Sequence, residues 1–215
     1  MKDILHFSHA NGFPGGSYRK MLSSLQADYN VQVIDRLAHN PVYPVTDNWA
    51  HLCDELIHFF EREYQQPVIA AGHSLGGLLS LMVAQRRPDL VKAIIMLDSP
   101  ALTRLQANGL RLAKWLGMVD RITPGGRSDG RRAVWADRNE AFEYFRGKTL
   151  MKRFDPDCLR DYVEAGTEPC EEGVRLRFDP ATELQIYRTI PHNIRAVQPL
   201  SVPGLAIGGS ESKVY

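Results

Sequence analysis

The feature that most constrains the fold is the stretch at residues 68–79, VIAAGHSLGGLL. A run of small apolar residues leads into a Gly-His-Ser-Leu-Gly turn, and a helix-like apolar run follows it. A G-x-S-x-G sequence between a strand and a helix holds a serine hydroxyl out at the carboxyl edge of a parallel sheet. The flanking glycines leave room for the tight turn, and the helix N-terminus stabilises negative charge beside the serine. We therefore predict that Ser74 is a catalytic nucleophile.

The alternative for this stretch is a glycine-rich turn without chemistry, of the kind that cradles a phosphate. Phosphate-binding turns of known type carry Gly-Lys-Ser/Thr or G-x-G-x-x-G, and neither pattern occurs at the turn. The strand before the turn and the helix after it favour the nucleophile.

The segments around this turn alternate between strand and helix patterns. Strands are predicted at residues 4–8, 31–35, 67–71 and 91–97, and helices at 18–25, from Trp49 to about 64, and at 75–87. Thr46 or Asp47 is the expected cap of the second helix. Apolar strands that alternate with helices indicate an α/β fold, with a mostly parallel sheet covered on both faces.

The pattern changes after Pro100. We expect helices at about 101–119, 137–146 and 156–165, a short strand at 174–178, and a return of sheet character only at 204–208. The chain is accordingly divided into a core at 1–100, a mostly helical insertion at 101–198, and a return to the core at 199–215.

Composition limits the classes of partner. The net charge of +1 over 215 residues favours neither nucleic acid nor a membrane as a partner. Cys53, Cys158 and Cys170 form no C-x-x-C pair, which favours a reducing compartment. The sequence has no signal-peptide pattern, no apolar run long enough to span a bilayer, and no H-E-x-x-H or nucleotide-cofactor motif. We expect a cytoplasmic protein that needs no metal or cofactor.

Several motifs together resemble the capped α/β-hydrolase family: HANGFPGG after the first strand, then GHSLGG, IIMLDSP and VPGLAIGG. The resemblance implies an α/β-hydrolase fold with a helical cap insertion. It also implies that two backbone N–H groups form an oxyanion hole, one from the loop at 9–13 and one from Leu75. Asn11 is the expected donor in the loop, with Gly12 and Phe13 as alternatives.

The resemblance also implies a carboxylate and a histidine that assist the serine. The expected carboxylate is Asp98, with Glu211 as the second choice. Asp98 could instead be only a strand-end turn residue. The family takes its histidine from a loop after the last strand, and none of the seven histidines here matches that position. We expect it beyond Tyr215 in a longer protein; the alternatives are His192 reaching in from the cap, or a shortened protein without an ordinary triad.

These expectations define a serine hydrolase that cleaves a small carboxylic ester or a related acyl compound on Ser74. Cap aromatics are candidates to roof an apolar pocket, although each is also explained by ordinary packing: Trp115, Trp135, Phe142, Tyr144, Phe145 and Phe154. The basic loop TPGGRSDGRR is expected to be solvated. The alternatives are hydrolysis of an amide, thioester or carbon–carbon bond, or a related protein that binds a ligand without catalysis.

Overall fold

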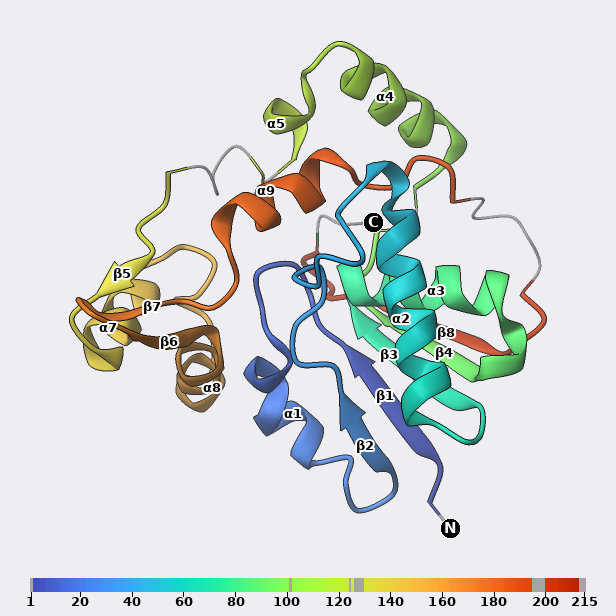
Figure 1. Ribbon diagram of the computed structural model, residues 1–215, viewed down its shortest axis with the longest axis horizontal. Helices are drawn as coiled ribbons and strands as arrows, with labels where there is room; N and C mark the ends of the chain where they lie inside the picture. Colours follow the sequence, from blue (N-terminus) through green and yellow to red (C-terminus); the bar gives the residue numbers. More distant parts are fainter. Residues whose placement is uncertain (1, 101, 124, 126–129, 195–199, 213–215) are drawn as a thin grey trace.

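The computed structural model describes residues 2–100, 102–123, 125, 130–194 and 200–212. Its centre is a five-stranded, fully parallel sheet with the order β2-β1-β3-β4-β8 (Figure 1). The strands are β1 (Ile4–Ser8), β2 (Asn30–Val33), β3 (Val68–His73), β4 (Val91–Leu97) and β8 (Gly204–Ile207). The predicted parallel α/β architecture is confirmed.

Helices cover both faces of this sheet. The 14-residue α2 (Ala50–Glu63) and the 12-residue α3 (Leu75–Arg86) share a buried cluster with Val68, Ala70 and Ile94 of the strands. On the other face, Leu22 of the short α1 (Arg19–Ser23) packs with a second set of strand residues, Leu5, Phe7 and Ala71. Alternate residues of β1 and β3 therefore face opposite layers, as the period of a strand requires.

The residues between β4 and β8, which we call the insert, contain both helices and strands. The helices are α4 (Arg104–Trp115), α5 (Val119–Ile122), α7 (Arg138–Arg146), α8 (Pro156–Gly166) and α9 (Pro180–Arg188). The strands β5 (Val134–Trp135), β7 (Gly173–Leu176) and β6 (Thr167–Cys170) form a small antiparallel sheet in that order. The sequence predicted α4, α7, α8 and the middle strand β7, but not α5, α9 or the two outer strands.

The insert has a hydrophobic core of its own. Trp135 and Phe145 lie in one buried cluster with Tyr162 of α8, and their rings are in contact. These aromatic side chains are explained by packing within the insert. Trp115 is different: its side chain is 81% exposed, so the idea that it roofs a pocket is wrong.

The start of α2 also departs from the expectation. Residues 47–49 form a short 3-10 turn (Asp47–Trp49), and the residue before α2 is Trp49, in the left-handed region at φ 56°. Neither Thr46 nor Asp47 makes a side-chain capping bond there. Instead, the indole N–H of Trp49 donates to the carbonyl of Ile186 at 3.1 Å, so α9 holds this end of α2.

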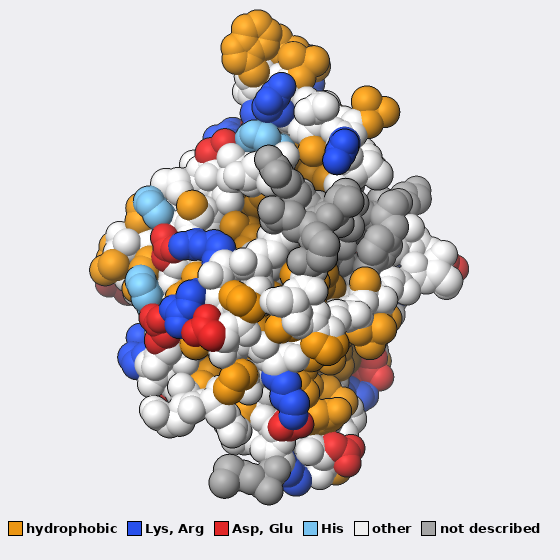
Figure 2. Space-filling model, turned by 90° about the vertical axis from the view of Figure 1, so that its right-hand side faces the viewer, with side chains coloured by type: hydrophobic (Ala, Val, Ile, Leu, Met, Phe, Trp, Pro, Cys, Tyr) orange, Lys and Arg blue, Asp and Glu red, His pale blue; other side chains and the backbone are white. Residues whose placement is uncertain are grey.

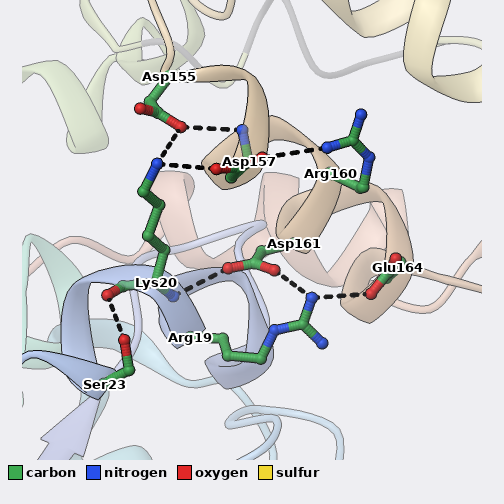
Figure 3. Close-up of polar contacts among 8 residues, drawn as sticks. All are labelled: Arg19, Lys20, Ser23, Asp155, Asp157, Arg160, Asp161 and Glu164. Atoms are coloured by element: carbon green, nitrogen blue, oxygen red, sulfur yellow. Dashed lines mark hydrogen bonds and ion pairs between the residues drawn. The ribbon is translucent and has the colours of Figure 1, made fainter.

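A cluster of ion pairs, exposed except for the buried Asp161, joins α8 of the insert to α1 of the core (Figure 3). The Lys20 ammonium lies 2.7 Å from Asp155 and 2.9 Å from Asp157, while Arg19 pairs with Asp161 and Glu164. Asp161 also accepts the backbone N–H of Lys20 at 2.9 Å. Cations on α1 thus face a row of carboxylates on one side of α8.

None of the described helices is both long and apolar enough to cross a membrane.

Candidate active site

Ser74 lies at the turn between β3 and α3, as the sequence predicts. Its φ of 50° and ψ of −109° are rarely adopted by a residue with a side chain. Its backbone N–H donates to the carbonyl of Leu97 at 2.9 Å, and its own carbonyl accepts the N–H of Leu78 at 3.1 Å. The strained turn is therefore held by the neighbouring strand β4 and by the first turn of α3.

The glycines around Ser74 are required by close backbone contacts. A Cβ at Gly72 would lie 2.2 Å from the carbonyl carbon of Gly76, and a Cβ at Gly76 would lie 2.0 Å from the carbonyl oxygen of Ser8. No real Cβ tolerates such approaches. The G-x-S-x-G spacing thus lets α3 begin directly against the ends of β1 and β3.

The loop at 9–13 follows β1 at the same edge of the sheet, because Ser8 is the register partner of Gly72. His9 anchors it: Nδ1 donates to the carbonyl of Ala10 and Nε2 accepts the N–H of Leu37, both at 2.8 Å. Burial lowers the pKa of His9 to about 4, so the ring is neutral near pH 7. His9 is a structural anchor of this loop.

The hydrogen bonds of the loop bear on the choice of oxyanion donor. The N–H of Phe13 is engaged in a turn with the carbonyl of Ala10 at 3.1 Å. In the part of the chain that the structure describes, neither Asn11 nor Gly12 donates its backbone N–H to another residue. Leu75 is the first residue of α3, where N–H groups have no partner within the helix. That Asn11 and Leu75 are the oxyanion donors stays a prediction. Of the two alternatives in the loop, Gly12 keeps an N–H without a described acceptor, whereas Phe13 does not.

Asp98 immediately follows β4, next to the turn at Ser74, and has a positive φ of 43°. Its backbone N–H donates to the carbonyl of Ile207 at 2.8 Å, and Oδ1 accepts the N–H of Gly209 at a long 3.5 Å. The Asp98 carboxylate also acts on His73: burial lowers the pKa of that ring, and the nearby negative charge partly offsets the effect. The structure places Asp98 at the same edge as Ser74, and its catalytic role stays a prediction.

Glu211, the second candidate acid, follows β8. Its carboxylate pairs with Arg153 at 2.9 Å, and both side chains are about four-fifths exposed. The geometry therefore favours Asp98, which is only partly exposed at the end of β4.

No histidine among the described residues hydrogen-bonds to Ser74. His73 points to Tyr18, whose hydroxyl lies 2.8 Å from Nδ1 and also accepts the N–H of Ala10 at 3.2 Å. His192 lies at the edge of an apolar cavity of about 260 Å³ between α3, β4 and β8, and its backbone N–H donates to Oδ1 of Asn48. Burial lowers its pKa, and the cation of Lys114 adds to this effect.

Within the described residues, no group of three histidine, cysteine or acidic side chains is placed to hold a metal ion. The three cysteines are free. The basic loop at 123–132 is described only at its ends, because residues 124 and 126–129 lie outside the described residues.

Sequence reasoning missed Glu183 and its ion-pair partner Arg131, which lie beside the loop at 9–13. Glu183 of α9 is buried, and a Cβ at Gly12 would lie 3.1 Å from its Cδ, so its carboxyl group packs against the loop. Its backbone carbonyl accepts Nδ2 of Asn11 at 3.0 Å, and Arg131 lies 2.6 Å from its Oε2. No signal links residue 183 to residue 11, since these positions meet only through the tertiary fold.

Comparisons with known proteins agree with this architecture. Residues 10–168 match the α/β hydrolase fold family. Pheophytinase, a chloroplastic protein of Arabidopsis thaliana, is 28% identical over 138 residues, which span 48% of this chain and 28% of that protein. The chain therefore matches little more than a quarter of the length of this relative.

Two solved structures show the same fold at low sequence identity. E-2-(acetamidomethylene)succinate hydrolase superposes with a TM-score of 0.73 and 19% identity, over 96% of this chain and 72% of that one. The thioesterase domain from the curacin biosynthetic pathway gives a TM-score of 0.69 and 18% identity, over 99% of this chain and 76% of that one. With a family match over most of its length and a nucleophile-type turn at Ser74, the chain belongs to the α/β hydrolase family.

Proposed function

We propose that this protein is a serine hydrolase that cleaves a small carboxylic ester, or a related acyl compound, through an acyl-enzyme on Ser74. The observation that carries the proposal is the conformation of Ser74, a non-glycine residue at φ 50° between a buried strand and the N-terminus of α3. Such strain is retained at functional sites where the surrounding structure enforces it.

The reaction follows the logic of serine acyl transfer. The Ser74 hydroxyl attacks the carbonyl carbon, and its proton passes to a histidine. That histidine returns the proton to the leaving alcohol as the acyl-enzyme forms. Water then attacks the acyl-enzyme by the same route and releases the carboxylic acid. The acyl group therefore ends as the acid, and Ser74 regains its proton.

The other residues serve the transition state. The backbone N–H groups of Asn11 and Leu75 donate to the oxyanion, and one such donor is typically worth about 3 kcal/mol. Asp98 orients the histidine and stabilises its charged form. The reaction needs no cofactor. We place the protein in the cytoplasm, in keeping with its three free cysteines.

A fluorophosphonate probe tests the nucleophile, because it reacts covalently with activated serines. We expect labelling of the full-length protein at Ser74, located by mass spectrometry of the labelled peptide. Ser74→Ala abolishes labelling. Ser210→Ala is the matched control, since Ser210 is an exposed serine on the loop after β8 and its loss leaves labelling intact.

A set of acyl substrates with a common acyl group then resolves the bond that is cleaved. Turnover of the ester in preference to the thioester and the amide supports the proposal, while preference for either of the others reassigns the reaction. If full-length protein of verified mass shows neither labelling nor turnover, the proposal is refuted in favour of a non-catalytic ligand-binding protein.

A further inference from the structure

Helix α4 carries its apolar side chains on the side that faces away from the protein. Leu105, Leu112 and Leu116 are spaced by seven and four residues and therefore share one face of a helix. They are 83%, 54% and 52% exposed, and Trp115 beside them is 81% exposed. A surface helix of a globular protein normally turns this stripe inward. We call these four residues the outer face of α4.

The outer face projects from the molecule. Figure 2 shows hydrophobic side chains standing out at the top of the protein, where Figure 1 places α4, with Lys or Arg side chains next to them. Leu110, on the opposite side, is the only buried residue of α4. Ile122 of α5 adds a further side chain that is 58% exposed next to this region. Several exposed apolar side chains grouped on one helix are typical of an interaction surface.

The helix is fully formed without a partner. Thr103 and Gln106 make a capping box at its start. At its end Gly117, at φ 67°, donates to Lys114 at 3.1 Å, and the N–H of Met118 donates to Ala113 at 2.8 Å, which is the Schellman pattern. Lys114 also forms an ion pair with Asp47 of the core. The outer face is therefore preorganised and held in its outward position.

The charges near the outer face that have no ion pair among the described residues are cationic, because Asp120 of α5 pairs with Arg188. From Leu102 to Val119 the sequence contains no acidic residue and three cations, of which Lys114 is directed to Asp47. Arg104 and Arg111 are exposed, and neither makes an ion pair with another described residue. Arg121 adds an exposed cation close to Ile122.

We propose that the outer face of α4 binds the surface of a lipid bilayer that contains anionic phospholipids. Apolar side chains with a cationic rim are the pattern of helices that lie in the plane of the membrane interface, and tryptophan favours that interface. The overall net charge of +1, from which no membrane partner was expected, does not reveal this local arrangement.

A second copy of the chain is the competing occupant, and the charges disfavour it. A two-fold contact places the same surface on both sides. Two outer faces would therefore bring Arg104 and Arg111 of both copies together with no acidic partner on α4. Anionic headgroups supply the opposite charge.

The tryptophans make the test direct. Trp49 and Trp135 are 3% and 1% exposed, so Trp115 is the one whose fluorescence reports on the outer face. Full-length protein is titrated with vesicles of phosphatidylcholine alone and with vesicles of equal parts phosphatidylcholine and phosphatidylglycerol. We expect a blue shift and protection from acrylamide quenching with the anionic vesicles, and loss of the signal change in Trp115→Phe.

Two double variants separate the apolar and the charged contributions. Leu112→Ser with Leu116→Ser keeps the reporter and lowers the partition coefficient by about tenfold or more, because apolar contact with the interface is lost. Arg104→Gln with Arg111→Gln lowers it by about tenfold or more on anionic vesicles only. Leu150→Ser is the matched control, because Leu150 is 66% exposed but lies outside α4, and it leaves binding unchanged.

Three results overturn the proposal. The first is the absence of any fluorescence change with anionic vesicles in a folded protein. The second is equal binding to both vesicle types that the double arginine variant does not alter. The third is a dimer seen by analytical ultracentrifugation without lipid and lost in the double leucine variant, which assigns the outer face to a second copy.

Discussion

Helices α3 and α4 have the same length of 12 residues but use their apolar side chains in opposite ways. Eight residues of α3 are buried, because the strands β1, β3 and β4 and the helix α2 pack against it. Only Leu110 is buried on α4, whereas Leu105 and Leu112 point outward. The difference shows that the surroundings of a helix, as well as its own sequence, decide whether an apolar face becomes core or surface.

The glycines of the two helices offer the strongest way to break this comparison. Gly76→Ala places a Cβ 2.0 Å from the carbonyl oxygen of Ser8, so the backbone of the turn at Ser74 must move. We expect a loss of more than about 4 kcal/mol in the free energy of unfolding. At Gly109 of α4 a Cβ meets no atom within 4 Å, and Gly109→Ala should stabilise the protein by about 1 kcal/mol or less. Chemical denaturation measures both, and a similar effect at the two positions would contradict the comparison.

Leucine truncation sharpens the same contrast. Leu79 of α3 is fully buried, and Leu79→Ala should cost about 2–5 kcal/mol of stability through lost contacts and a cavity. Leu112→Ala on the outer face should change stability by about 0.5 kcal/mol or less, because the side chain is already 54% exposed. Urea unfolding of both variants tests this. A large loss for Leu112→Ala would mean that the outer face is covered in the folded protein.

The pH dependence of stability is set in the core by two buried histidines. Burial lowers the pKa of His9 from 6.5 to about 4 and that of His6 to about 3. Below pH 6.5 the unfolded chain takes up protons that the folded core does not. Stability is therefore fully present above pH 6.5 and falls as the pH drops towards 4.

For His9 alone this amounts to about 3 kcal/mol across that window. His9→Gln should remove that share of the pH dependence, although its stability at neutral pH also changes. The measurement is the slope of unfolding free energy against pH. An unchanged slope in the variant would show that His9 takes up its proton equally in both states.

Much of the core could be predicted from the sequence. The strands at 4–8 and 91–97 are found at the predicted residues. Buried parallel strands consist of short apolar runs between turn residues, so the sequence shows them directly. The turn at Ser74 was located for a similar reason. The glycines and the serine that this turn requires are close together in the sequence, so their spacing alone reveals it.

The insert was harder to predict. Helix α4 was expected from its repeating leucines, but periodicity cannot tell which side of a helix meets the protein. Trp115, a candidate to roof a pocket, is exposed instead. The outer strand β5 is too short, at two residues, to show a period, and in β6 the sequence TEPC has no apolar run. Asp98 and Glu211 could not be separated from the sequence, because their difference lies in the tertiary surroundings that each carboxylate meets.

The contact between Asn11 and Glu183 has a consequence for how the protein is made. Nδ2 of Asn11 donates to a carbonyl that lies 172 residues further along the chain. The loop after β1 is therefore synthesised well before its buried polar partner in α9. The candidate oxyanion loop therefore reaches its final hydrogen bonding only after α9 has been made and has closed this long loop of chain. Nascent chains that lack α9 therefore lack this hydrogen bond of the candidate loop.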